Sequence, residues 1–267
     1  MSGDNISFGG SVPEYYDNFL GPALFEPFAI DLVSRISSDK TNAVLELACG
    51  TGRVTHHLRK HFPAHVKIIA TDLNPDMIAV AKRKVPAQGI AWEIADMQEL
   101  PFPDQTFDLV VCQFGVMFVP DKAKAFREAY RVLTKGGTFL FNTWDNIENN
   151  GITSLANQVV SSYFNQPSAF YAIPFSLHQP DVLRSLATDN GFVRATITLV
   201  KQNGHSDSPL DAAKGMIQGT PILKEITDRD PSAVKPIVEL LRNEISKTFG
   251  DGPVVNPLQA WVGEALK

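Results

Sequence analysis

The chain has 267 residues and a formal net charge of −5, and 44% of its residues are hydrophobic, enough to bury a full core in one or two domains. Its 29 acidic residues outnumber 24 basic ones, so we expect no nucleic-acid-binding face, which would need clustered Lys and Arg. No run of about 18 apolar residues occurs, and Met1–Asn5 lacks the features of a signal peptide. We therefore expect a soluble, cytoplasmic protein without membrane insertion.

The first elements in the chain are predicted to be two short helices, over residues 13–19 and 24–33, interrupted by Gly21-Pro22. Tyr15 and Tyr16 lie in the first of them, where one interpretation is that both anchor an amphipathic helix. We expect residues 1–40 to form a helical cover over the rest of the chain.

A short apolar run without polar alternation, Val44–Leu47, predicts a strand that is buried on both faces. The small residues 48–52 allow the backbone to turn tightly and to pass close to a ligand. A helix is expected to begin at Arg53, which places its free N–H groups at this turn. The pattern predicts a nucleoside-binding turn.

Asp72 ends the next apolar run, about 20 positions after Gly52, which is where a dinucleotide-binding fold holds ribose hydroxyls. A pyrophosphate-binding fingerprint would need the order G-x-G-x-x-G. After Gly50 and Gly52, however, no third glycine arrives at the required position. This spacing disfavours a nicotinamide cofactor.

Three further segments follow in order. Residues 90–97 predict a third strand that ends in the acid Asp96, and a loop with two prolines, 101–106, leads into a fourth apolar strand over 107–113. Residues 131–141 predict the end of a helix, a Gly136-Gly137 turn at its C-cap and a fifth strand.

Glu46-Leu47-Ala48-Cys49-Gly50-Thr51-Gly52 resembles the E/D-x-G-x-G-x-G signature of class I S-adenosylmethionine (SAM)-dependent methyltransferases, with Ala48 in place of the first glycine. The resemblance covers about residues 40–145 and includes the three later segments. It implies SAM as cofactor, with Asp72 on the ribose, Asp96 on the adenine amino group and Tyr16 near the methionine end. The implied cofactor-binding residues are Tyr16, Glu46, Ala48, Cys49, Gly50, Gly52, Arg53, Asp72, Leu73, Met77, Asp96, Met97 and Gln113.

The remainder of the chain is expected to complete the sheet. Residues 180–192 predict a helix, 193–202 a sixth strand and 254–266 a last strand, with two amphipathic helices inserted over about 206–252. Aromatic residues gather in the connection 149–179 and suggest a pocket wall. The inserted helices are interpreted as a lid over the acceptor, a homodimer face or plain packing on the sheet.

We predict an α/β fold with a doubly wound, seven-stranded, mostly parallel sheet and an antiparallel last strand. Residues 1–267 are expected to form one domain, with a cofactor-binding core over 41–145 and a C-terminal half over 146–267. The predicted function is methyl transfer from SAM to a small organic acceptor, at oxygen or carbon. A non-catalytic SAM-binding module and a nicotinamide-dependent oxidoreductase are the alternatives.

Few residues are candidates for proton transfer. His178 in the aromatic connection and Asp145 after the fifth strand could act as bases if the acceptor must lose a proton; an exposed loop histidine is the other interpretation of His178. Cys49 and Cys112 have no second Cys or His at metal-ligand spacing, so we expect neither a metal site nor a disulfide.

Overall fold

The structure is a computed structural model that describes residues 12–37, 41–85 and 89–267. The chain divides into two compact units, each assembled from three segments. The first unit comprises Met1–Pro27, Asp145–Ser176 and Lys201–Gln259, and the second comprises Phe28–Trp144, Leu177–Val200 and Ala260–Lys267. The expected single domain over 1–267 stays a prediction.

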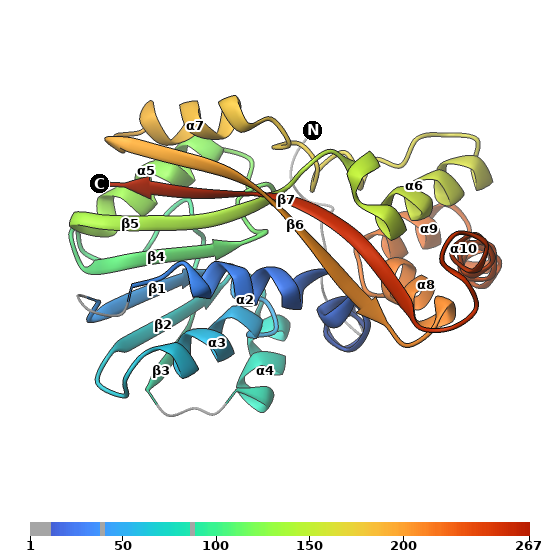
Figure 1. Cartoon of the computed structure of the whole chain (residues 1–267), viewed down its shortest axis with the longest axis horizontal. Coiled ribbons are helices and arrows are strands. Elements are labelled where there is room, and N and C mark those ends of the chain that lie inside the picture. Colours follow the sequence, from blue (N-terminus) through green and yellow to red (C-terminus); the bar gives the residue numbers. More distant parts are fainter. Residues whose placement is uncertain (1–11, 38–40, 86–88) are drawn as a thin grey trace. The chain divides into compact units, whose positions relative to one another are not determined.

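Seven strands form one sheet in the order β3-β2-β1-β4-β5-β7-β6 (Figure 1). The parallel strands pair β1 with β2 and β4, β2 with β3, and β4 with β5, whereas β7 runs antiparallel to β5. This confirms the predicted mostly parallel sheet with its antiparallel last strand. The strands are β1 (Ala43–Leu47), β2 (Lys67–Asp72), β3 (Ile90–Ile94), β4 (Phe107–Gln113), β5 (Leu133–Trp144), β6 (Arg194–Ser206) and β7 (Val254–Leu266).

Burial explains why β1 is apolar at every position except Glu46. It lies between β2 and β4, and Val44, Leu45 and Leu47 are almost completely buried. A strand that is covered on both faces needs apolar residues at consecutive positions. Because β1, β2 and β4 are parallel, their carboxyl ends meet at one edge, which brings the residues after them together. The helices among the second unit's strands are α3 (Arg53–His61), α4 (Pro75–Lys84), α5 (Lys122–Val132) and α7 (Pro180–Thr188).

The N-terminal helices are continuous, so the predicted break at Gly21-Pro22 is wrong. α1 (Val12–Tyr15) passes into a π-helix, η1 (Tyr16–Phe25), and then into α2 (Glu26–Ser34). The N–H of Glu26 donates to the carbonyl of Gly21 five residues earlier, as in the wide turns of a π-helix. These wider turns accommodate Pro22, which has no N–H to donate.

The insertion contains three α-helices rather than the two predicted: α8 (Pro209–Gln218), α9 (Ile222–Arg229) and α10 (Val234–Phe249). The first predicted helix is split because α8 ends at Gln218, with Gly219 as its C-cap, and Pro221 caps the start of α9. A Cβ at Gly219 would lie 2.6 Å from the Gly215 carbonyl oxygen and 3.0 Å from the Tyr16 nitrogen, so close packing on η1 requires glycine there. The remaining helices are α6 (Gly151–Tyr163) and the 3₁₀ turns Ile147–Asn149 and Pro231–Ala233.

Two strand boundaries also differ from the prediction. β6 extends to Ser206 beside the equally long β7. The Gly136-Gly137 pair does not cap α5, because β5 already begins at Leu133. Instead the two glycines form a bulge inside β5, where the register against β4 shifts between its first and second pairs and Gly136 has a φ of 80°.

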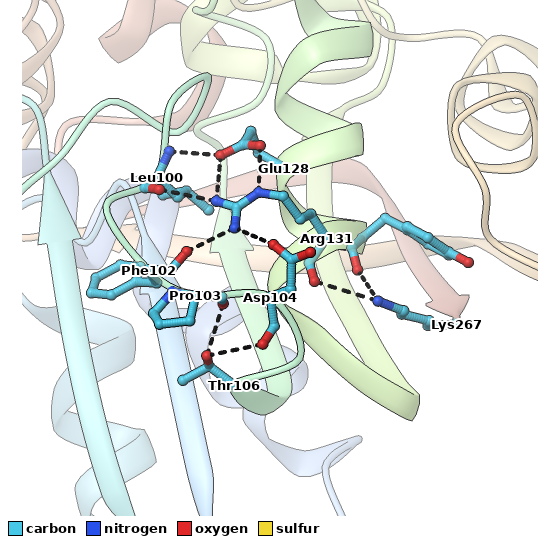
Figure 2. Close-up of polar contacts among 9 residues, drawn as sticks. Leu100, Phe102, Pro103, Asp104, Thr106, Glu128, Arg131 and Lys267 are labelled. Carbon is cyan, nitrogen blue, oxygen red and sulfur yellow. Dashed lines mark hydrogen bonds and ion pairs between the residues drawn. The ribbon is translucent and has the colours of Figure 1, made fainter.

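Arg131, near the end of α5, holds the proline-containing loop that leads into β4 (Figure 2). Its guanidinium donates to the carbonyl oxygens of Leu100 (3.0 Å) and Phe102 (2.7 Å) and to the carboxylate of Asp104 (2.8 Å). Two further bonds, both 2.8 Å, reach the Glu128 carboxylate. These contacts link the loop that leads into β4 to the end of α5, which leads into β5. The link lies at the edge of the sheet opposite the turn that follows β1.

Replacing Arg131 by alanine is expected to lower the free energy of unfolding by about 2 to 4 kcal/mol, because Glu128 would lose its ion pair and three loop acceptors their donor. Urea unfolding measures the change. Arg184→Ala is the control, since Arg184 is half exposed and its ion pair is with the exposed Asp181; a loss below about 1 kcal/mol is expected there. Equal losses in both variants would contradict the role of Arg131.

Within residues 12–37, 41–85 and 89–267, every helix is too short or too polar to span a lipid bilayer.

Candidate functional site

The turn between β1 and α3 has three residues in the left-handed region: Ala48 (φ 51°), Gly50 (φ 54°) and Gly52 (φ 83°). The two glycines are required for different reasons. A Cβ on Gly50 would meet no atom within 4 Å, so this position faces open space. A Cβ on Gly52 would lie 3.0 Å from Ala81 of α4 and 3.0 Å from Val85, which follows α4, so this position is closely packed. Of the two glycines, Gly50 is the one placed to pass a ligand.

Asp72, the last residue of β2, contacts this turn directly. Its Oδ2 accepts the N–H of Gly50 at 2.8 Å, and its Oδ1 accepts the N–H of Asn74 at 2.8 Å. Burial raises the pKa of the Asp72 carboxyl, and backbone N–H donors from Asn74, Gly50 and Leu73 oppose that rise. The structure therefore brings together the turn and the acid that the sequence pattern pairs.

Glu46 lies in β1, two residues before the turn, and only 2% of its surface is exposed. Burial raises the pKa of its carboxyl to about 8, Thr55 opposes that rise and the neighbouring Asp72 adds to it. The Oε2 atom of Glu46 has no hydrogen-bond partner among the described residues. A buried carboxyl with a free oxygen is suited to a cationic group, whose approach would favour its ionised form.

Because of Glu46, the free energy of unfolding is expected to fall as the pH rises. Between its ordinary value of 4.5 and about 8, only the folded protein keeps the Glu46 proton, so raising the pH favours unfolding. The slope approaches about 1.4 kcal/mol per pH unit for one such group. Urea titrations of the unliganded protein across this range should give a flatter pH dependence for Glu46→Gln than for the parent. Parallel curves would contradict the buried, protonated carboxyl.

Asp96 lies two residues beyond β3. Its Oδ1 accepts the backbone N–H of Gln98 at 2.8 Å, and the Gln98 amide also reaches its carboxylate, at 3.2 Å. The N–H of Ala95 donates to the carbonyl of Asp72 at 3.2 Å, which joins the exits of β2 and β3. Asp72 and Asp96 thus follow adjacent strands at the same edge.

The other predicted cofactor residues of the second unit differ in accessibility. Leu73 is 66% exposed, whereas Met77, Met97 and Cys49 are buried, and burial raises the pKa of the Cys49 thiol. Arg53 begins α3 and Gln113 ends β4, and both are partly exposed. An exposed apolar side chain next to an acid, such as Leu73 beside Asp72, can contact the edge or face of a bound ring. No group of three or more metal-ligating side chains occurs within the described ranges.

Tyr16 and Asp145 belong to the first unit. Tyr16 stacks on Phe25 with ring centroids 4.7 Å apart. Asp145 is 8% exposed, and its Oδ2 accepts the side-chain amide of Asn149 at 2.7 Å, so it also organises the turn that precedes α6. His178 precedes α7 in the second unit and is partly exposed. The roles proposed for these three residues stay predictions.

The aromatic connection is attached to α9 within the first unit. The Glu225 carboxylate accepts the Ser168 hydroxyl and the Phe170 N–H, both at 3.0 Å, and pairs with Arg229 at 3.0 Å. Tyr171 is buried, whereas Tyr163 is 39% exposed. The connection is therefore ordered by polar contacts, and its role as a pocket wall stays a prediction.

Sequence reasoning missed Asn142, a completely buried residue of β5. Its Oδ1 accepts the N–H of Phe114 at 2.9 Å, directly after β4, where Phe114 has a φ of 50°. The one signal in the sequence is a single amide within the apolar run of β5, because a buried amide needs a specific partner.

Comparisons with known proteins agree with this arrangement. A family profile described as a methyltransferase domain matches residues 45–141. The chain is 36% identical over 126 residues to the ubiquinone/menaquinone biosynthesis C-methyltransferase UbiE of Marinomonas sp. (strain MWYL1), covering 46% of this chain and 49% of the relative. It is 42% identical over 97 residues to a demethylmenaquinone methyltransferase of Lactiplantibacillus plantarum, covering 35% of this chain and 41% of the relative. The chain thus spans about half or less of these relatives' lengths.

Among solved structures, the fold is similar to Haemonchus contortus phosphoethanolamine N-methyltransferase 2 in complex with S-adenosyl-L-methionine. The TM-score is 0.59 at 18% identity, over 96% of this chain and 56% of that one. The profile match runs from within β1 to within β5 and includes the turn at Gly50 and both acids. With this sheet, this turn and this match, residues 45–141 form a methyltransferase domain.

Proposed function

We propose that the protein transfers a methyl group from SAM to a carbon or oxygen atom of a small organic acceptor. The observation that carries the proposal is the bond between the Gly50 N–H and the Asp72 carboxylate, beside the open space at Gly50. It joins a turn that leaves room for a ligand to an acid that can hold a ribose.

The residues present fit SAM at three points. The free Oε2 of Glu46 suits the ammonium group at the methionine end. The Asp72 carboxylate accepts the Gly50 and Asn74 N–H groups on different oxygens and retains acceptor capacity for a ribose hydroxyl. Asp96 likewise retains acceptor capacity for the adenine amino group, and the exposed Leu73 would cover the ring.

SAM supplies a methyl group that is already activated on a sulfonium. The protein must therefore hold the acceptor in line with the bond that breaks and exclude water, and it needs no nucleophile of its own. A base is required only for an acceptor that loses a proton, a role we assign to His178 or Asp145. Because matched relatives include UbiE C-methyltransferases, quinone precursors with an apolar ring are the first acceptors to test.

Calorimetric titration with SAM, S-adenosylhomocysteine and NAD tests the cofactor. Binding of the first two without NAD supports the proposal, and binding of NAD alone would favour the oxidoreductase alternative. Incubation with methyl-labelled SAM and a panel of phenolic and quinol acceptors then tests transfer. SAM binding without label transfer to any acceptor or to a metabolite extract would favour a non-catalytic SAM-binding module. Sedimentation of the same samples would show whether a homodimer forms.

A further inference from the structure

Gly115 is the second residue after β4 and is buried. Its φ is outside the left-handed region, so its backbone conformation does not require glycine. Its surroundings do, because a Cβ at this position would lie 2.6 Å from the Ala48 Cβ and 2.7 Å from the Cys112 Sγ. The Ala48 methyl group therefore lies in the space that a side chain at position 115 would occupy.

The segment that carries Gly115 cannot easily move away. The Phe114 N–H is bonded to both the side-chain and the backbone oxygen of the buried Asn142, at 2.9 and 3.3 Å. The Phe118 N–H donates to the Gly115 carbonyl at 3.0 Å. Both sides of Gly115 are thus held by hydrogen bonds.

The turn on the other side is equally constrained. The N–H of Cys49 donates to the Thr71 carbonyl at 2.9 Å, and the N–H of Gly50 donates to Asp72 at 2.8 Å. The Ala48 Cβ is fixed to this backbone, whereas the Cys112 sulfur can rotate about one bond. A side chain at position 115 would therefore displace the turn through Ala48 rather than through Cys112.

We propose that Gly115 is a positioning residue of the SAM site: it receives the methyl group of Ala48 and so keeps residues 48–52 in the shape that binds the cofactor. This inference rests on the proposed function. Positions 48 and 115 together have room for one methyl group, which explains how this chain carries alanine where the family signature has its first glycine.

The test is a mutant cycle with SAM affinity measured by calorimetry and folding checked by circular dichroism and thermal melting. Gly115→Ala is expected to weaken SAM binding by about tenfold or more. Ala48→Gly alone should bind within about threefold of the parent, because glycine adopts the same positive φ without strain. Ala48→Gly/Gly115→Ala should return to within about threefold of the parent, since the pair again carries one methyl group.

Two further variants serve as controls. Gly252→Ala adds a methyl group where no atom lies within 4 Å and should leave SAM affinity unchanged. Cys112→Ala/Gly115→Ala should not restore binding, because the Ala48 contact remains.

Rescue by Ala48→Gly supports the inference even if Gly115→Ala alone fails to fold, because the double variant would recover both folding and affinity. Parent-like affinity of Gly115→Ala would overturn it, as would rescue by Cys112→Ala but not by Ala48→Gly. A parent protein that binds no SAM would instead overturn the proposed function itself.

Discussion

Gly50→Val is expected to weaken SAM binding by more than about 100-fold, which corresponds to about 2.8 kcal/mol. The side chain would extend into the open space beside the turn, where the proposed cofactor lies. A β-branched residue is also strained at a φ of 54°. Calorimetric titration with SAM measures the loss, provided that the variant is folded.

Gly136→Val provides a matched control for strain. Gly136 also has a positive φ, 80°, and a Cβ added there would also meet no atom within 4 Å. It lies, however, in the bulge of β5, at the edge of the sheet opposite the turn. The control should lose comparable stability and keep its affinity for SAM. If Gly50→Val were folded and bound SAM like the parent, the turn would not face the cofactor.

Asp72→Ala is expected to weaken SAM binding by at least about tenfold, because one hydrogen bond to a charged group contributes about 1.5 to 3 kcal/mol. The variant also removes the acceptor of the Gly50 N–H, so the turn loses one of its anchors. Both effects act on affinity in the same direction, and calorimetry with SAM measures their sum.

Asp76→Ala controls for the loss of one negative charge near the site, since Asp76 is an exposed acid in the first turn of α4. It should bind SAM within about twofold of the parent, because solvent and salt screen an exposed charge. A folded Asp72→Ala protein with parent-like affinity would show that the ribose assignment is wrong.

The central part of the fold could be predicted because its constraints are local. The predicted fourth strand, 107–113, and last strand, 254–266, coincide with β4 and β7. Their apolar patterns are bounded by turn residues, and a buried strand needs little further information. The tight turn between β1 and α3 was also predictable, because its small residues and glycines allow positive φ values; its role in cofactor binding stays a prediction.

The errors arose where tertiary packing decides. Gly21-Pro22 is a break signal in most helices, and only the π-helix that packs on α8 allows the chain to continue there. Asn142 and Gly115 could not be recognised because their roles depend on contacts with Phe114 and Ala48, which lie far away in the sequence. Such pairings leave no periodic pattern in a single sequence.

The order of the strands has a consequence for synthesis on the ribosome. β1 to β5 follow one another in the chain and can pair as they emerge, but β7 lies between β5 and β6 in the sheet although it follows both in sequence. β6 must therefore wait, unpaired with the growing sheet, until a strand about 50 residues later inserts beside it. During that interval the free edges of β5 and β6 are exposed to other chains, so misassembly and chaperone dependence are expected to concentrate at this last step of folding.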